Sequence, residues 1–179
     1  LGNTSLMAIK YRGVKQGMLL LDCFFRVEIS DKVANANDSH KKTDGQRYLP
    51  DNLIRICIDE RGQLHQQFLP PDTINAIQQY VDIDTAIKVV KSREEVIKQL
   101  LKHAETSVDK ALPEKIQQAS ARATELLQKE IDRLQALQTI NPNVRDEEIE
   151  FFQSQLDQTL QQIHSANIRL DAIRVMVAV

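Results

Sequence analysis

The spacing of apolar residues changes near residue 70, and this change constrains the fold more than any other feature of the sequence. Before that point apolar residues recur at every second position, as in strands with one buried face. After it they recur at three- and four-residue spacings, as in amphipathic helices. Pro70 and Pro71 mark the boundary. The sequence therefore predicts an α+β fold, with a β region over residues 1–70 and a helical region over residues 71–179.

The β region is expected to form an antiparallel sheet of about four strands. In the clearest strand, residues 19–29, every odd position is apolar, whereas Asp22 and Arg26 occupy even positions. Residues 54–58 repeat the alternation, and a turn at 60–62 allows residues 64–69 to return as a hairpin partner. Residues 5–11 form a weaker strand. The polar, turn-rich segment 30–47 is interpreted as a mobile loop.

The helical region is expected to contain a short helix ending near residue 80 and a long helix from about residue 84. Pro113 either begins a new helix or kinks a continuing one. A turn at residues 140–144 then leads into a last helix through about residue 177, so that the chain ends in an antiparallel helical hairpin. Asn143 is expected to cap that helix. We interpret the two regions as one domain and, because position 1 is Leu, as a fragment of a larger protein.

The composition argues against membrane and nucleic-acid binding. No apolar run reaches the roughly 18–20 residues that a membrane-spanning helix needs. From residue 81 onward, 16 acidic residues face 13 basic ones, and only 4% of the chain is aromatic. This balance is unfavourable for contacts with phosphates and for base stacking. Cys23 and Cys57 each lie in an apolar stretch, and we expect buried free thiols in a reducing compartment.

No group of residues predicts catalysis. The sequence contains no phosphate-binding loop with a following Lys-Ser or Lys-Thr, and no HExxH, GxSxG or CxxC motif. The strand acids Asp22, Asp59 and Glu60 are expected to face solvent. We therefore predict no catalytic residue, no bound cofactor and no metal ligand, and a hydrolase that uses Asp22 and Asp59 is the weakest alternative. The histidines stand apart from one another and from the cysteines: His40, His65, His103 and His164.

Several stretches resemble the C-terminal domain of the bacterial RapA family of RNA polymerase-associated proteins. Residues 136–149, ALQTINPNVRDEEI, are similar to a helix–turn–helix joint of that family. Residues 169–175, RLDAIRV, are similar to its chain end. Residues 17–22, 48–50 and 58–62 match more loosely. The resemblance covers most of the chain and is weak over residues 30–47.

The resemblance implies a role in transcription. Members of the family are SWI/SNF-type, helicase-like, ATP-hydrolysing translocases that bind DNA and RNA polymerase, activate transcription and help to recycle the polymerase. Their ATP and magnesium sites belong to motor domains that no residue here matches. The resemblance therefore implies a non-catalytic accessory domain in the bacterial cytoplasm, whose partners are RNA polymerase and the motor domains of its own chain.

A contact surface is expected near the end of the sequence, at Arg169, Asp171 and Arg174. This expectation treats the three residues as part of the last helix. Two other classes of function stay open at this point. One is a coiled-coil oligomerisation or protein-docking module without a direct role in transcription. The other is a nucleic-acid-binding accessory domain, for which the net charge of −2 has the wrong sign.

Overall fold

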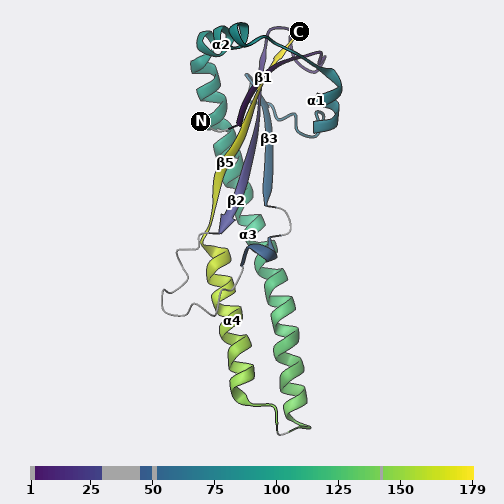
Figure 1. Cartoon of the computed structure of the whole chain (residues 1–179), viewed down its shortest axis with the longest axis vertical. Coiled ribbons are helices and arrows are strands. Elements are labelled where there is room, and N and C mark those ends of the chain that lie inside the picture. The colour runs from purple at the N-terminus through teal and green to yellow at the C-terminus, as the bar shows by residue number, and fades with distance from the viewer. Residues whose placement is uncertain (1–2, 30–44, 50–51, 142) are drawn as a thin grey trace. The chain divides into compact units, whose positions relative to one another are not determined.

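The computed structural model describes residues 3–29, 45–49, 52–141 and 143–179 (Figure 1). The chain divides into two compact units. Unit 1 comprises Leu1–Arg26, Leu53–Ala111 and Ile168–Val179, and unit 2 comprises Val27–Asn52 and Leu112–Asn167. That residues 1–70 and 71–179 together form one domain remains a prediction.

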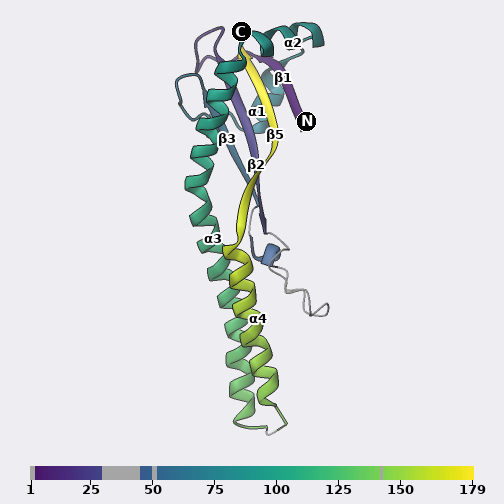
Figure 2. The same cartoon turned by 90° about the vertical axis from the view of Figure 1, so that its left-hand side faces the viewer.

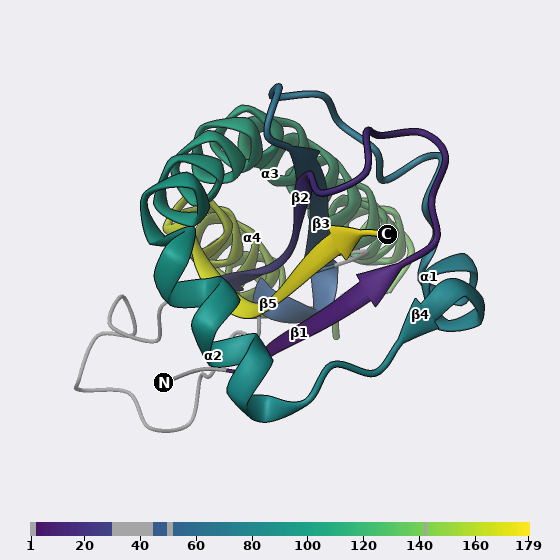
Figure 3. The same ribbon diagram turned by 90° about the horizontal axis from the view of Figure 1, so that it is seen from above.

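The central feature of the fold is a five-stranded sheet in the order β3-β2-β5-β1-β4 (Figure 3). β2 pairs with β3, and β1 with β4, in antiparallel fashion, whereas β1 and β5 are parallel. The α+β class is confirmed, but the sheet is mixed and not purely antiparallel. The strands are β1 (Asn3–Ile9), β2 (Leu19–Ile29), β3 (Leu53–Asp59), β4 (Gln78–Gln79) and β5 (Ala166–Ala178).

The prediction that the chain ends in a helical hairpin is wrong. Residues 166–178 form β5, which lies between β2 and β1. Its pairing with β1 is continuous from Asn3 opposite Ala172 to Ile9 opposite Ala178. Val175 and Met176 are buried there. Backbone pairing and burial in the middle of a sheet outweigh the helix-like spacing of a few apolar residues.

The predicted hairpin partner at residues 64–69 is not a strand. Ile58 and Leu64 form an isolated bridge, and the chain then leads into helix α1 (Pro71–Ile77). Pro70 occupies the N-cap of this helix, and Pro71 occupies its first turn. A proline is favourable in the first turn of a helix because the backbone N–H group that it lacks has no partner there.

The two faces of the sheet are buried by different helices in unit 1. On one face, α1 supplies Ile74 to a fully buried cluster. On the other face, the first part of α3 runs beside the sheet (Figure 2). Val108 of α3 and Phe25 of β2 line the same hollow there. The sheet therefore has buried side chains on both faces at its centre. The cluster under α1 comprises Ile9, Leu20, Cys57, Leu69, Ile74, Met176 and Ala178.

The long predicted helix is divided, but not at the proline. Helix α2 (Ile83–Ser92) ends at Arg93, and α3 (Glu94–Gln138) then continues through Pro113. The Asp82 side chain caps α2 by accepting a hydrogen bond from the Thr85 N–H group at 2.9 Å. None of the helices among the described residues is long and apolar enough to cross a membrane.

Unit 2 contains the rest of α3 and helix α4 (Asp146–His164). Ile131 and Leu134 of α3 pack with Ile149 of α4. The predicted cap residue Asn143 does not cap α4, because the N-cap is Arg145, which makes no side-chain capping bond. The acidic first turn of α4 is as expected from the helix dipole.

The segment predicted as a mobile loop is described only at its end. Residues 30–44 lie outside the described residues, whereas the short 3-10 helix η2 (Gly45–Tyr48) is well defined. Gly45 is buried, and its N–H group donates to the Gln162 Oε1 atom at 3.0 Å. Within unit 2, η2 is therefore held against the end of α4 by a specific hydrogen bond.

Candidate functional site

The three residues predicted as a contact surface lie on strand β5. Asp171 forms a 3.1 Å ion pair with Arg26 of β2, and both side chains are partly exposed. Arg174 lies near Asp22 of β2, with 3.9 Å between Nη1 and Oδ2. Arg169 is exposed and lies two residues before Asp171 on the same strand. The role of these residues in contacts with a partner remains a prediction.

A change in alternation along β5 brings these residues to the same face of the sheet. Leu170 lines a hollow with Phe25, whose side chain points toward α3. Arg174, four residues later, reaches Asp22, which belongs to the opposite face of β2. Side chains of a regular strand would place residues 170 and 174 on one face. The alternation therefore shifts by one residue between them, as it does at a β-bulge.

We call the resulting surface the charged face and define it by six residues. Arg26 and Asp171 lie at its more open part, whereas the Arg174 guanidinium, one nitrogen of which is buried, lies near the buried Asp22. Three arginines and two aspartates give it an excess of one positive charge, to which Arg169 adds. The members come from three adjacent strands: Asp22, Phe24, Arg26, Arg55, Asp171 and Arg174.

Asp22 is the electrostatic centre of the charged face. Its side chain is fully buried, and its Oδ1 atom accepts a 2.7 Å hydrogen bond from the Arg55 Nε–H group. The guanidinium groups of Arg55 and Arg174 lie 5.9 and 5.8 Å from the ring centroid of Phe24. The ring faces therefore help to hold both cations beside the buried carboxylate.

Burial dominates the titration of Asp22. It raises the pKa of Asp22 above the usual range, although the hydrogen bond from Arg55 and the charges of Arg55 and Arg174 act in the opposite direction. Among the described residues, Asp22 Oδ2, Arg55 Nη2 and Arg174 Nη1 are buried without a hydrogen-bond partner. The prediction that Asp22 faces solvent is wrong. Its partner Arg55 is 33 residues away in the sequence, so no local motif indicates the contact.

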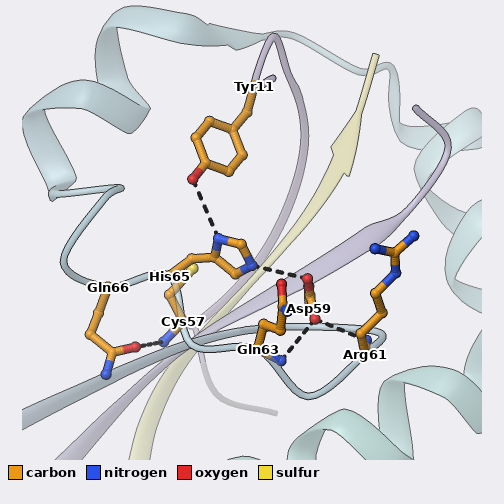
Figure 4. Close-up of polar contacts among 7 residues, drawn as sticks. All are labelled: Tyr11, Cys57, Asp59, Arg61, Gln63, His65 and Gln66. Carbon is orange, nitrogen blue, oxygen red and sulfur yellow. Dashed lines mark hydrogen bonds and ion pairs between the residues drawn. The ribbon is translucent and has the colours of Figure 1, made fainter. Parts of the chain in front are cut away.

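A second polar cluster joins Tyr11, His65 and Asp59 (Figure 4). The Nε2 atom of His65 lies 3.0 Å from Asp59 Oδ2, and its Nδ1 atom lies 3.3 Å from the Tyr11 hydroxyl. Asp59 and His65 are both buried. The prediction that Asp59 faces solvent is wrong.

Asp59 holds the turn that follows β3. Its Oδ1 atom accepts hydrogen bonds of 2.9 Å from the backbone N–H groups of Arg61 and Gln63. Burial alone would raise the pKa of Asp59, but the hydrogen bonds from His65, Gln63 and Arg61 hold it below the usual range. Because this carboxylate is occupied by three donors, the arrangement orients a turn and does not present a free base. In the sequence, the only local indication of this arrangement was the turn predicted at residues 60–62. Gly62 adopts a φ of 79° in that turn.

The third strand acid, Glu60, is also engaged. Its Oε1 atom accepts hydrogen bonds from the Leu19 N–H group at 2.8 Å and from Arg93 at 2.7 Å. Its side chain is partly exposed. Glu60 therefore ties the end of β3 to the start of β2 and to the residue between α2 and α3.

The prediction of two buried free cysteines is confirmed. Cys23 lies opposite Ile56 in the β2–β3 pairing, and Cys57 lies opposite Asp22. Because adjacent residues of a strand point to opposite faces, the two thiols lie on different sides of the sheet. Burial raises the pKa of each thiol to about 12, so both stay protonated and unreactive near neutral pH. Within the part of the chain described, no group of His, Cys, Asp and Glu side chains could hold a metal ion.

Comparison with known proteins identifies the protein family to which this chain belongs. Residues 1–178 match the family model described as RNA polymerase recycling family C-terminal, and the chain belongs to this family. The relatives that it matches bear the name RNA polymerase-associated protein RapA. No residue range of the chain matches a catalytic family.

The chain corresponds to a small share of these relatives. It is 32% identical over 178 residues to RapA of Pseudomonas putida, covering 99% of this chain and 18% of the relative. RapA of Stutzerimonas stutzeri shows the same identity and coverage. RapA of Pectobacterium carotovorum is 29% identical over 176 residues, covering 98% of this chain and 17% of the relative. The description of the family and the name that these relatives share make association with RNA polymerase and a connection with transcription properties of the family.

Proposed function

We propose that this chain is the non-catalytic accessory domain of an ATP-dependent, RNA polymerase-associated translocase that promotes polymerase recycling. In this proposal the domain acts in the bacterial cytoplasm, and its partners are RNA polymerase and the motor domains of the full-length protein. ATP, magnesium and DNA would bind to the motor domains. The family match over residues 1–178 supports the assignment to a C-terminal domain.

The observation that carries a docking role is the charged face. Arg26 and Asp171 are partly exposed, and Arg169 is exposed beside them. Exposed arginines are effective contact residues because a guanidinium offers several donors in a fixed plane and packs against apolar groups. Arg174 serves a different purpose, because its guanidinium is directed toward the buried Asp22. We therefore assign partner contact to Arg169, Arg26 and Asp171 and a supporting position to Arg174.

The coiled-coil alternative is less well supported. Ile131, Leu134 and Ile149 are buried within unit 2 by contacts between α3 and α4 of the same chain. The buried part of each apolar stripe is therefore not available to a second copy, which would have to use exposed apolar residues such as Leu126, Leu137 and Phe151. Light scattering at high protein concentration tests this point, and a stable dimer would favour the oligomerisation function.

Calorimetric titration of the chain with RNA polymerase core enzyme, and separately with the purified motor domains, tests the proposal. We expect binding to at least one of them, and weaker binding at high salt because exposed charges contribute. Arg26→Glu and Arg169→Glu should each weaken the interaction. Arg122→Glu is a matched control because Arg122 is exposed on α3 and is not one of the residues of the charged face.

Each result has a definite meaning. Binding to neither protein would refute the docking role, and equal affinities for all variants would refute the assignment to the charged face. ATP hydrolysis by the purified chain would contradict the non-catalytic assignment. Tight, steeply salt-dependent binding to DNA alone would instead support a nucleic-acid-binding function.

A further inference from the structure

Helix α2 leaves part of its apolar stripe uncovered. Ile83 and Ile87 lie four residues apart on one side of the helix, and they are 72% and 47% exposed. Ala86, Val89 and Val90 of the same helix are half-buried. An amphipathic helix of a globular protein usually turns its apolar stripe toward the core. α2 therefore buries one part of this stripe and exposes the part that contains the two isoleucines.

The outer edge of β1, on the side of β4, is also incompletely covered. β4 contains only two residues, and these pair with Ala8 and Ile9. On the other side of β1, the pairing with β5 extends from Asn3 to Ile9. Among the described residues, no strand pairs with the outer edge of residues 3–7. An uncovered strand edge is a place where a further extended segment can add to a sheet.

The backbone of Leu6 faces this uncovered edge. On the outer side, the Lys10 N–H group donates to the Ile77 carbonyl at 3.3 Å. On the side of β5, the Ile9 carbonyl accepts from the Val179 N–H group at 3.0 Å. Backbone groups of successive residues in a strand alternate between its two edges. Counting back from Lys10 therefore places the N–H and C=O groups of Leu6 on the outer edge, beyond the reach of β4.

Both uncovered surfaces lie where the chain enters unit 1. In the views of Figures 2 and 3, β1 begins on the side of unit 1 that carries α2. In the proposed function, this chain is the C-terminal domain, and the motor domains precede residue 1 in the full-length protein. The chain covers only 17–18% of the RapA relatives, which leaves most of their length outside it. A segment that leads into β1 therefore arrives beside both surfaces.

The small size of the two surfaces favours an occupant from the same chain. A stable interface between separate proteins usually buries about 800 Å² on each partner and involves about 20–30 residues a side. Two isoleucines and a short strand edge fall well below that size. A segment tethered through a short linker instead has an effective concentration in the millimolar range, so a weak contact is enough to keep it docked.

We propose that the region preceding residue 1 in the full-length protein docks on α2 and on the outer edge of β1. Apolar side chains of that region pack on Ile83 and Ile87, and an extended stretch of its backbone pairs with Leu6. The existence of this region rests on the proposed function. The contact holds the accessory domain against the rest of the protein, so that the domain does not swing freely on a linker.

Photocrosslinking in the full-length protein identifies the occupant. The photoreactive amino acid p-benzoylphenylalanine is placed at position 83 or, as the control, at position 126, where Leu126 is 51% exposed on α3. We expect position 83 to crosslink to residues that precede residue 1 in the same chain, and position 126 to give no such product. Crosslinks from position 83 only to a second copy or to RNA polymerase, no crosslink, or the same product from both positions would overturn the proposal.

Hydrogen exchange measured by mass spectrometry provides a second criterion. Docking gives the Leu6 N–H group a hydrogen-bond partner, and a hydrogen-bonded amide exchanges more slowly. We expect exchange in peptides that cover residues 3–9 to be about three- to tenfold slower in the full-length protein than in the separate chain. Equal exchange in the two proteins would overturn the pairing with β1.

Two double variants of the full-length protein test the role of α2. Ile83→Gln combined with Ile87→Gln removes the apolar contact at exposed positions and keeps good helix-forming residues. Leu126→Gln combined with Leu137→Gln makes the same change at exposed positions of α3 and is the control. The α2 variant should lose most of the protection of residues 3–9, whereas the control should keep it. Protection that survives in the α2 variant would overturn the contact with α2.

Titrations of the same proteins with RNA polymerase core enzyme separate this inference from the proposed function. If the full-length protein does not bind the polymerase, the proposed function fails, and the crosslinks and exchange rates then decide the docking on unit 1. Equal polymerase binding by both variants, with protection lost only in the α2 variant, supports a contact within the protein. Weaker polymerase binding by the α2 variant without a crosslink inside the chain would assign the surface to the polymerase and overturn the proposal.

Discussion

Replacing Arg55 should destabilise the protein more than neutralising Asp22, although the two residues form one ion pair. The Asp22 side chain is fully buried, whereas Arg55 and Arg174 keep 13% and 21% of their side-chain surface exposed. Without Arg55, a buried carboxylate loses its 2.7 Å donor and retains only the more distant Arg174. Asp22→Asn instead leaves two arginine side chains that each keep part of their surface exposed, although one nitrogen of each guanidinium is buried.

The expected magnitudes follow from this difference in burial. Removing one partner of a buried ion pair costs about 3–5 kcal/mol, and the nearby Arg174 places Arg55→Met near the lower end, at about 3 kcal/mol. Asp22→Asn should cost about 1–2 kcal/mol, the range for a lost buried hydrogen bond. For a chain of this length, a loss of about 3 kcal/mol lowers Tm by roughly 6–12 °C. The double variant should cost at least about 1 kcal/mol less than the sum, because the two residues are in contact.

The pH dependence gives an independent check of the same reasoning. The pKa of Asp22 is raised in the folded state, so the folded chain binds a proton more readily than the unfolded chain. Its contribution to stability is therefore most favourable at low pH and declines as the pH rises through the raised value. Arg55→Met removes an interaction that lowers this pKa, so the pKa of Asp22 rises further in the variant, and the cost of the substitution should shrink as the pH falls through that raised pKa.

Urea unfolding followed by circular dichroism measures these effects. Arg122→Met is the control, since an exposed arginine outside the cluster should change the free energy of unfolding by less than about 0.5 kcal/mol. If Asp22→Asn proves as costly as Arg55→Met, the explanation from burial of the carboxylate is wrong. A cost of Arg55→Met that does not vary with pH would refute it as well.

Three further substitutions test other parts of the fold. The pKa of Asp59 is lowered in the folded state. Asp59 therefore contributes its full stabilisation above its usual pKa, and this contribution is lost as the pH falls through the lowered pKa of the folded state. Asp59→Asn should flatten the acid limb of a curve of unfolding free energy against pH. Pro113→Ala should stabilise the protein by up to about 3 kcal/mol and raise Tm, because alanine restores a backbone N–H donor inside the continuous helix α3. A lower Tm would show that the proline ring has a packing role. A Cβ atom on Gly45 would lie 3.1 Å from the Gln162 side chain, so Gly45→Ala should destabilise unit 2 by about 1 kcal/mol in urea titrations, and an unchanged midpoint would mean that Gln162 moves freely.

The sequence was informative where the apolar pattern is regular, and misleading where it is not. β2 alternates without interruption and was predicted with its observed bounds. In β5, the alternation shifts between Leu170 and Arg174, and this shift leaves apolar residues at positions 170, 173 and 177. Those spacings of three and four residues imitate a helix. One bulge-like irregularity thus explains why a strand was predicted as a helix.

The candidate sites show the same limit for a different reason. Arg169, Asp171 and Arg174 could be selected from the sequence, but their common face follows from the shift in β5. Arg26 and Asp171 form an ion pair although they lie 145 residues apart in the sequence, and the buried Asp22 pairs with Arg55, 33 residues away. Such contacts are set by the order of strands in the sheet, which local periodicity does not encode.

The position of β5 in the sheet also determines when the sheet can assemble during protein synthesis. Without β5, the order β3-β2-β5-β1-β4 separates into two unconnected pairs of strands. Asn3 meets its partner Ala172 only after 169 further residues have been made. At about 5–20 residues per second, the growing chain keeps the inner edge of β1 uncovered for roughly 8–34 s, and the inner edge of β2, which is made later, for a shorter time. During this interval the nascent chain exposes two incomplete sheet edges, at which ribosome-bound chaperones or neighbouring chains can bind before the strand that closes the sheet arrives.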